Sequence, residues 1–305
     1  MTKLFYFPEN AGRNKYILNS VRVWEKCGYH VLPLNNILSY LFSSNKVVVF
    51  NWLEDAPSIA RFPLISTLKC LSAVLFCFFI CDKIIYVKHN IAPHNSRSFF
   101  SRLYFRLISF ILTKLSDDIV THRPLAHIDS KFINHPLYNN QKNIETIRDI
   151  EFSWVGKVMS YKGLDKLLMT WPIDRYLVIS GKCDDNEYSI LIRSIIQNRS
   201  LNVNWIDSEL SDNELESILL RTKYLVLSHI DNTMIVSGMF YHAATFGCNI
   251  LLSDGYFADF SINEFSFANS VDSDLVYVNP DEVIYEINET CSDDSLASKW
   301  RQVIN

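Results

Sequence analysis

The feature that most restricts the fold of this chain is the alternation of short apolar runs with longer segments of helical spacing. Apolar, often β-branched runs fall at residues 3–7, 30–34, 46–51, 83–88 and 118–121, and again at 152–155, 176–180, 203–206, 224–228 and 249–252. Helical spacing covers 14–27, 64–80, 98–115, 162–171, 187–198, 212–220 and 235–246. Strands that alternate with helices favour parallel sheets with helices on both faces. The sequence therefore predicts an α/β protein.

The alternation occurs in both halves of the chain, which indicates two domains. A chain of 305 residues is long enough for two domains of about 150 residues each. We place them at residues 1–140 and 150–305, joined by a polar linker near 138–149. Ligands of parallel sheets bind beyond the carboxyl ends of the strands. We therefore expect two Rossmann-like domains that face a ligand-binding cleft.

The two halves carry opposite charge. Residues 1–145 hold 17 Lys and Arg against 9 Asp and Glu, a net charge of +8, and residues 146–305 hold 12 against 24, a net charge of −12. The basic half suits anionic lipid or a phosphorylated acceptor. It lacks the Lys/Arg-rich runs and the aromatic signature of RNA-binding domains, so we expect no nucleic acid partner.

Cysteine usage and the start of the chain predict a cytoplasmic protein. The first fifteen residues lack the charged start and apolar core of a secretory signal. The seven cysteines are an odd number, without a CxxC pair or zinc-like His/Cys spacing, which is typical of reduced thiols. His89 and His94 have no third clustered ligand, so we expect no zinc.

Two apolar segments of the first half bear on membrane attachment. Residues 64–80 contain Lys69 and are short for a hydrocarbon core of about 30 Å, so we expect a buried helix, with an interfacial helix as the alternative. Residues 98–115 are rich in Phe and Leu and carry Arg102 and Arg106 on one helical face. A cationic, Phe-rich helix suits peripheral attachment at a membrane surface. The alternative is a core helix with two solvated arginines.

The second half contains a pattern that suits a phosphate group. Residues 152–168 read FSWVGKVMSYKGLDKLL, in which a strand is followed by Gly156 and Lys157, and Lys162 opens a helix. A glycine lets backbone approach a ligand, lysines supply positive charge, and a helix N-terminus adds its dipole and free N–H groups. Exposed loop lysines are the alternative interpretation of this pattern.

A second stretch strengthens the phosphate interpretation. Residues 224–254 read YLVLSHIDNTMIVSGMFYHAATFGCNILLSD, in which Ser237 and Gly238 open a helix after another strand. A Ser-Gly step there can present a hydroxyl and unhindered amides to a phosphate. Because both stretches follow strands of one sheet, we expect them to serve a single diphosphate.

Both stretches resemble the donor-domain signature of the GT-B glycosyltransferases, notably the large family four and related bacterial polysaccharide enzymes. The resemblance implies that Lys157 and Lys162 contact a nucleotide diphosphate, and that Gly156, Ser237 and Gly238 complete the donor site. It implies no cofactor and no bound metal, because lysines and a helix dipole can stabilise a departing diphosphate. The paired acids at 184–185 and 293–294 are expected to be solvated surface residues.

The first half resembles the same enzymes in four ordered places. Residues 14–16 (NKY) are similar to their NPY, 51–54 (NWLE) to HWPE, 88–94 (KHNIAPH) to THN..PH, and 135–138 (HPLY) to HGNY. The resemblance implies an acceptor site that includes Asn14, Asn90 and His94.

One departure concerns the mechanism. Retaining members of family four carry two glutamates eight positions apart at the donor loop, where this chain has Met234 and His242. The retaining or inverting outcome therefore stays open. For catalysis we select His89 as a sugar or phosphate contact and Glu54 as candidate base, since both follow strand ends. The alternatives are a hydrogen-bonded structural histidine and a helix-capping or ion-paired glutamate.

The sequence thus predicts a glycosyltransferase that moves a hexose-type sugar from a UDP- or GDP-sugar to a lipid-linked oligosaccharide in bacterial surface polysaccharide synthesis. It would work as a peripheral protein at the inner face of the cytoplasmic membrane. The alternatives are a catalytically silent partner subunit of the same fold and a sugar-nucleotide epimerase.

Overall fold

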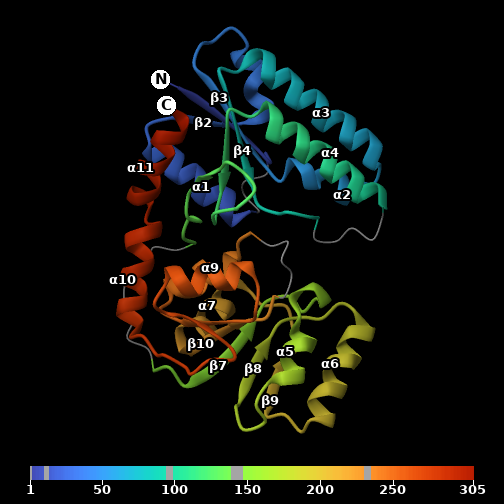
Figure 1. Cartoon of the computed structure of the whole chain (residues 1–305), viewed down its shortest axis with the longest axis vertical. Coiled ribbons are helices and arrows are strands. Elements are labelled where there is room, and N and C mark those ends of the chain that lie inside the picture. Colours follow the sequence, from blue (N-terminus) through green and yellow to red (C-terminus); the bar gives the residue numbers. More distant parts are fainter. Residues whose placement is uncertain (1, 10–13, 94–98, 139–146, 230–234) are drawn as a thin grey trace. The chain divides into compact units, whose positions relative to one another are not determined.

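The computed structural model describes residues 2–9, 14–93, 99–138, 147–229 and 235–305. These residues form two compact units (Figure 1). One comprises Met1–Tyr138, Thr233–Val236 and Thr290–Asn305, and the other comprises Asn139–Asn232 and Ser237–Glu289. Each unit is built on a six-stranded parallel sheet, which confirms the α/β class and the two-domain organisation. His94, Met234 and most of the expected linker lie outside the described residues.

The first sheet has the strand order β2-β1-β3-β4-β5-β6. Its strands are β1 (Lys3–Phe7), β2 (His30–Pro33), β3 (Lys46–Asn51), β4 (Lys83–Lys88), β5 (Asp118–Thr121) and β6 (Lys131–Phe132). The run KVVVFN of β3 is buried along its whole length, as expected for an inner strand of a parallel sheet with both faces covered. The two-residue β6 has no sequence signal of its own.

Helices cover both faces of this sheet, and strand alternation decides which side chain meets which helix. The helices are α1 (Lys15–Lys26), η2 (Leu34–Tyr40), η3 (Leu53–Asp55), α2 (Ala56–Ile59), α3 (Pro63–Ile80) and α4 (Phe99–Leu115). Val47 and Val49 of β3 pack in the cluster that contains α1. Val48 and Phe50, which point the other way, pack in the cluster that contains α3 and α4.

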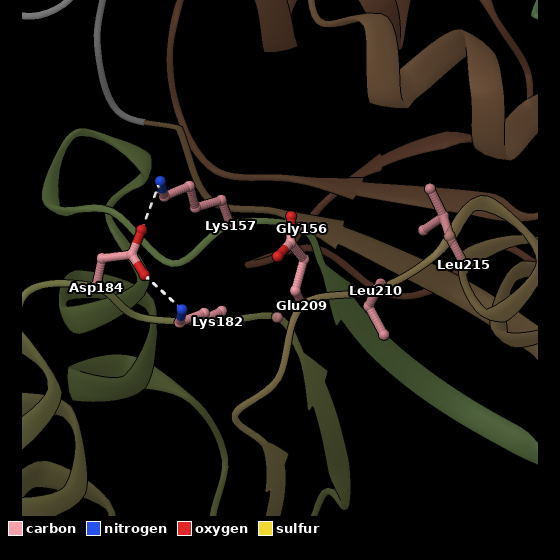
Figure 2. Close-up of a pocket in the computed structure, with 8 residues that line it drawn as sticks. Gly156, Lys157, Lys182, Asp184, Glu209, Leu210 and Leu215 are labelled. Atoms are coloured by element: carbon pink, nitrogen blue, oxygen red, sulfur yellow. Dashed lines mark ion pairs between the residues drawn. The ribbon is translucent and has the colours of Figure 1, made fainter.

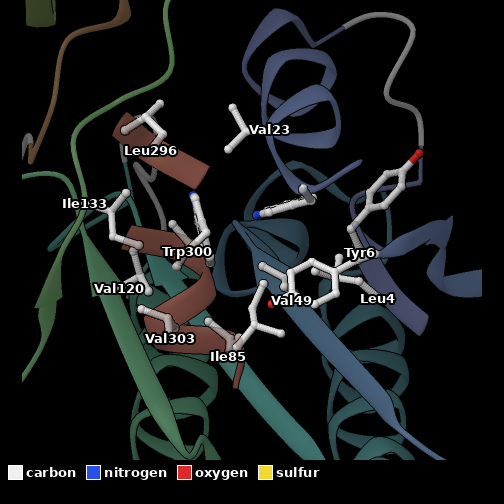
Figure 3. Packing of buried hydrophobic residues seen from close by; sticks show 14 of the residues in the cluster. Leu4, Tyr6, Val23, Val49, Ile85, Val120, Ile133, Leu296, Trp300 and Val303 are labelled. Carbon is white, nitrogen blue, oxygen red and sulfur yellow. The ribbon is translucent and has the colours of Figure 1, made fainter. Parts of the chain in front are cut away.

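The end of the chain belongs to the first unit, which corrects the expected boundary of the second domain at 150–305. After α10 (Pro280–Cys291), helix α11 (Asp293–Ile304) packs on α1. Trp300 meets Trp24 edge to face, with ring centroids 5.4 Å apart, inside the buried cluster of the first sheet (Figure 3). Arg22 Nε donates to Asp293 Oδ2 over 2.6 Å. Asp293 is therefore a structural ion-pair partner and not an unpaired surface acid.

The second sheet has the order β12-β11-β10-β7-β8-β9. Its strands are β7 (Ile150–Val155), β8 (Leu177–Ser180), β9 (Val203–Ile206), β10 (Thr222–Leu227), β11 (Asn249–Leu252) and β12 (Ala268–Ser270). Its helices are η4 (Ser160–Lys162), α5 (Leu164–Thr170), α6 (Asn186–Asn198), α7 (Asp212–Arg221), α8 (Gly238–Thr245) and α9 (Tyr256–Glu264). The order reverses between β7 and β10, which is the switch point where ligands of such sheets bind.

The apolar segment around 64–80 forms α3, but the expectation of a buried helix is wrong. Within the described residues, α3 is the one helix long and apolar enough to cross a membrane by length and composition, and only 22% of it is buried. The neighbouring α4 also exposes large apolar side chains, among them Phe99 and Phe110. The sheet covers one side of each helix, and the remaining surface of both stays apolar.

The packing of α11 generates a prediction about stability. Trp300→Ala removes a side chain that is 3% exposed, so we expect the free energy of unfolding of the first unit to fall by about 3–5 kcal/mol. Denaturant unfolding followed by tryptophan fluorescence measures this change. Gln302→Ala, an exposed position on the same helix, is the matched control. An unchanged midpoint for Trp300→Ala would show that α11 does not contribute to this core.

Candidate active site

In the second unit, the ends of β7 and β8 are held in backbone contact. Gly156 N donates to Ser180 O over 2.9 Å, and Val158 N donates to Lys182 O over 2.9 Å. A Cβ on Gly181 would lie 1.9 Å from Gly156 O, so only glycine at 181 permits this approach. Gly156 itself has a φ of 110°, a conformation that favours glycine. The backbone of Gly156 and Gly181 thus forms one surface at the carboxyl edge of the sheet, which we call the backbone platform.

Charged side chains border a pocket of about 270 Å³ beside this platform (Figure 2). Lys157 Nζ lies 2.6 Å from Asp184 Oδ2, and Lys182 Nζ lies 3.2 Å from Asp184 Oδ1. Hydrogen bonding to Asp184 raises the pKa of Lys157, and the same lysines lower the pKa of Asp184. All three side chains are about half exposed, so this ion pair is screened and can be exchanged. Leu210 and Leu215 add an apolar wall to the pocket.

Lys162 occupies a different environment. Its ammonium lies 5.4 Å from the centre of the Trp154 ring and 3.1 Å from the place where a Cβ on Gly156 would lie. Burial lowers the pKa of Lys162 to about 8. Among the residues that the structure describes, no acidic group pairs with it. A largely buried cation without a counter-ion is costly, and it marks a place where an anion would be stabilised.

Ser228, at the end of β10, fixes the position of Lys162. Its hydroxyl donates to Lys162 O over 2.6 Å and accepts from Trp154 Nε1 over 2.9 Å. Because β7 and β10 are the strands on either side of the switch point, this link holds the buried lysine at the crevice between them. The sequence contains no local signal for this role of Ser228.

The later donor loop begins as predicted. Ser237 is the N-cap of α8, is 6% exposed, and makes no capping hydrogen bond with its side chain. Gly238 is the first helical residue. Since α8 follows β10, its N-terminus lies at the carboxyl edge of the sheet, as do Gly156 and Lys162. The position of Ser237 and Gly238 agrees with the prediction, and their binding role stays a prediction.

In the first unit, the predicted catalytic residue Glu54 is fully buried. The pKa of Glu54 is raised to about 7, mainly by burial and also by the charge of Asp55, while hydrogen bonding from the backbone and Tyr86 and the charge of Lys88 act in the opposite direction. Lys88 Nζ donates to Ser109 Oγ over 2.7 Å. Glu54 therefore lies beneath the end of β3 rather than on its surface, so in this conformation it cannot touch an acceptor.

Asp55 and Asn90 lie beside each other at the same strand ends. Asn90 Nδ2 donates to Asp55 Oδ2 over 2.9 Å, and Asn90 is 3% exposed. Asp55 is half-buried. The predicted acceptor residue Asn90 thus orients a carboxylate, and that carboxylate retains access to solvent.

His89 and Asn14 have structural partners. His89 Nε2 lies 3.1 Å from Asn51 Oδ1, and its ring stacks on Trp52 with centroids 3.8 Å apart. Burial holds the pKa of His89 well below its usual range, so it is neutral. Asn14 caps α1, because its Oδ1 accepts from Tyr16 N over 3.0 Å. The contacts of His89 match the alternative of a hydrogen-bonded structural histidine, and the roles of His89 and Asn14 in binding stay predictions.

Further buried histidines complete this region. His122 Nδ1 donates to Ile133 O over 2.7 Å, so its Nε2 accepts from the Tyr16 hydroxyl at 3.0 Å. Burial lowers the pKa of His122 to about 4. His135 packs on the same tyrosine, with centroids 5.0 Å apart. Within the described ranges, no group of three or more His, Cys, Asp or Glu side chains is arranged to hold a metal ion.

The comparisons with known proteins agree with this architecture. Matching the sequence to protein-family models and to curated proteins found no relative. Among solved structures, AviGT4, a glycosyltransferase of avilamycin A biosynthesis, is similar at a TM-score of 0.62 and 12% identity, over 100% of this chain and 97% of that one. Anabaena HepE in complex with UDP and glucose gives a TM-score of 0.55 and 12% identity over 100% and 94%. Sucrose-phosphate synthase from Thermosynechococcus elongatus gives 0.53 and 11% over 88% and 76%.

The chain has the GT-B fold. This confirms the fold that the sequence motifs predicted for both halves. In GT-B terms, the unit that carries Lys157 and Lys162 is the expected donor domain, and the unit that carries Asp55 and Asn90 is the expected acceptor domain.

Sequence reasoning missed part of the candidate site. Gly181 and Lys182 follow β8 in the same way as Gly156 and Lys157 follow β7, and the repeated strand–Gly–Lys step could have revealed them. Asp184 was expected to be a solvated surface acid, whereas it pairs with both lysines. That pairing depends on the close approach of two loops, which a linear sequence does not display.

The raised pKa of Glu54 in this GT-B chain predicts a specific pH dependence. Because the folded-state pKa of about 7 exceeds the ordinary 4.5, the stability that Glu54 contributes is complete below 4.5 and is lost as pH rises through 7. Glu54→Gln should therefore be more stable than the unsubstituted protein above pH 7, by up to about 3 kcal/mol, and equal to it near pH 4. Denaturant unfolding across this pH range measures the difference, with exposed Glu151→Gln as control. If the difference in unfolding free energy between the two proteins does not vary with pH, the raised pKa of Glu54 is refuted.

Proposed function

We propose that this protein is a glycosyltransferase that moves a sugar from a UDP- or GDP-sugar to a lipid-linked oligosaccharide during bacterial surface polysaccharide assembly. The observation that carries the proposal is the largely buried ammonium of Lys162, which has no acidic partner among the described residues and lies against Gly156 at the switch point of the second sheet. An anionic diphosphate supplies the missing counter-charge. The GT-B fold and the UDP complex of HepE support this assignment.

The donor diphosphate would exchange partners with an existing ion pair. In the structure Lys157 and Lys182 form ion pairs with Asp184. A diphosphate at the platform offers more negative charge than one carboxylate, so Lys157 would turn from Asp184 to the phosphate oxygens. The N-terminus of α8 adds partial positive charge. These groups would stabilise the nucleoside diphosphate as it leaves the sugar.

The pocket beside Lys157 fits the nucleoside. Leu210 and Leu215 offer apolar surface for the base, and the backbone of Gly156 and Gly181 forms the adjacent edge. Binding sites of this kind are largely apolar, with a few polar groups that set orientation. We assign the base to this pocket and the diphosphate to the platform.

On the acceptor side, we propose Asp55 as the group that removes the proton of the acceptor hydroxyl. It is half-buried, and Asn90 fixes its carboxylate through a 2.9 Å hydrogen bond. Glu54, the base suggested by sequence, lies fully buried behind it. Asn90 is then a positioning residue. Work at the inner face of the cytoplasmic membrane, as a peripheral protein, is part of the proposal.

The donor site is tested by nucleotide-dependent thermal stabilisation. Ligand at about 100 times Kd should stabilise the folded protein by about 2.7 kcal/mol, and we expect UDP or GDP to do so in preference to CMP. Lys162→Ala should weaken binding at least tenfold without lowering the stability of the free protein, since it removes an uncompensated buried charge. Lys157→Ala should weaken binding while leaving the fold intact.

Lys166→Ala is the matched control, an exposed lysine on α5 of the same domain. If no nucleotide shifts the melting temperature of the folded protein, the donor-site proposal is wrong. Binding without turnover would instead point to a catalytically silent partner subunit. Conversion of the donor sugar without any acceptor would point to an epimerase.

The base assignment is tested by paired amide substitutions. Asp55→Asn should lower turnover by about 10²–10⁴-fold while keeping nucleotide binding, and Glu54→Gln should keep most of the activity. The measurement is sugar transfer to a lipid-linked acceptor at saturating donor. If Glu54→Gln abolishes transfer and Asp55→Asn does not, Glu54 is the base and must become accessible during turnover.

A further inference from the structure

The outer surface of α3 and α4 in the first unit is apolar to an unusual degree. The two helices lie side by side against the sheet (Figure 1). Large apolar side chains on this α3–α4 face are exposed, among them Leu64 (58%), Leu68 (56%), Phe79 (75%), Phe99 (70%), Leu103 (47%) and Phe110 (61%). The mean hydropathy of α3 is 2.0. Many large exposed apolar side chains on two adjacent helices mark a site of contact with a protein or a membrane.

The fold determines how α3 could meet a membrane. Its buried residues Thr67, Cys70, Val74 and Cys77 follow helical spacing along one side. Three of them, Cys70, Val74 and Cys77, belong to the cluster that packs on the sheet. A helix anchored along its length in this way cannot leave the sheet to cross a bilayer without destroying the core. The geometry therefore suits a helix that lies in the plane of the interface with its outer side buried in lipid.

The charges on this face favour an anionic partner. Exposed cations lie among the apolar side chains: Lys69 on α3, and Arg102, Arg106 and Lys114 on α4. Lys114 Nζ lies 6.0 Å from the centre of the exposed Phe110 ring. The sequences of α3 and α4 contain no Asp or Glu. Basic residues beside apolar side chains are the combination that binds membranes containing anionic lipids.

The same charges argue against a second copy of the chain as the partner. A symmetric dimer would place this face against itself, so Lys69, Arg102, Arg106 and Lys114 would approach their own equivalents. Without acidic residues on either helix, that arrangement leaves like charges facing each other in an apolar interface. An anionic bilayer provides the opposite charge and an apolar interior in one surface.

We propose that the α3–α4 face is a membrane-docking surface that inserts its apolar side chains into the interfacial region of a bilayer containing anionic lipids, with Arg102 and Arg106 at the headgroups. The sequence indicated interfacial character for residues 98–115 and a buried helix for 64–80; the structure joins both segments in one surface. This docking surface rests on the proposed work at a membrane and not on the donor site, so docking can fail while nucleotide binding succeeds, and the reverse.

Vesicle flotation of the full chain tests the proposal, without nucleotide. The probes are vesicles of phosphatidylcholine alone and of phosphatidylcholine mixed with phosphatidylglycerol. We expect stronger flotation with the mixed vesicles and a loss of this preference at high salt. Arg102→Glu with Arg106→Glu should weaken binding to the mixed vesicles at least about tenfold. Leu68→Asn with Phe79→Asn should weaken binding to both kinds of vesicle.

The control variants change exposed apolar and cationic side chains of the second unit instead. Ile190→Asn replaces a side chain that is 68% exposed on α6, and Lys166→Glu with Lys223→Glu reverses two exposed cations. Both should float as the unsubstituted chain does. Because all substituted side chains are exposed, circular dichroism melts should be unchanged. If the variant with Arg102→Glu and Arg106→Glu floats with the mixed vesicles as strongly as the unsubstituted chain, the assignment of these arginines to anionic headgroups is wrong. If the chain does not float with either kind of vesicle and is instead a dimer that Leu68→Asn with Phe79→Asn converts to a monomer, the proposal is wrong. The partner of the α3–α4 face would then be a second copy of the chain.

Discussion

Parallel strand pairing is the constraint on which the rest of this structure depends. Every strand pair in the two sheets, as far as they are described, runs parallel, so each strand ends at the same edge of its sheet as its neighbours. Residues that are far apart in sequence are therefore brought together at this edge. Gly156 and Gly181 meet at one such edge, and Asp55 and Asn90 meet at the other. The crossover helices that parallel pairing requires then cover the faces and leave these edges open.

The carboxyl edges of the two sheets differ in the kind of charged group that is buried near them. In the second unit Lys162 is a largely buried lysine whose pKa burial lowers to about 8, and the proposed donor diphosphate would supply its counter-charge. In the first unit the buried group is an acid, Glu54, whose pKa rises so that it titrates near neutrality. In the same unit, His122 accepts a hydrogen bond from Tyr16 and donates one to Ile133 O. The proposed roles of the two edges, a negatively charged donor at one and an acceptor hydroxyl at the other, follow from this difference in buried charge.

The two faces of the first sheet are covered differently, and the proposed membrane docking relies on this difference. One face is closed by α1 together with α11, which returns from the end of the chain and contributes Trp300 to the core. The other is closed by α3 and α4, whose outer sides no described residue covers, so that Phe79 and Phe99 stay exposed. Burial on one side and exposure on the other fit a domain that works against a lipid surface while the opposite side stabilises the fold. A lipid-linked acceptor would be reached from such a surface.

The sequence by itself determined the secondary structure of most of the chain and pointed to the elements that we propose bind phosphate. Hydrophobic periodicity is a local property, so strands such as β3 and the helix capped by Asn14 were readable within a few residues. The Gly156-Lys157 and Lys162 positions were readable because phosphate binding needs glycine and lysine at a strand–helix junction. The tertiary structure alone decided the assignments that depend on distant contacts: α11 in the first unit, Asp184 as partner of two lysines, Glu54 buried and Asp55 accessible, and α3 exposed rather than enclosed. Burial and charge pairing are set by neighbours that are distant in sequence, and a linear pattern does not specify which side of an apolar helix those neighbours will cover.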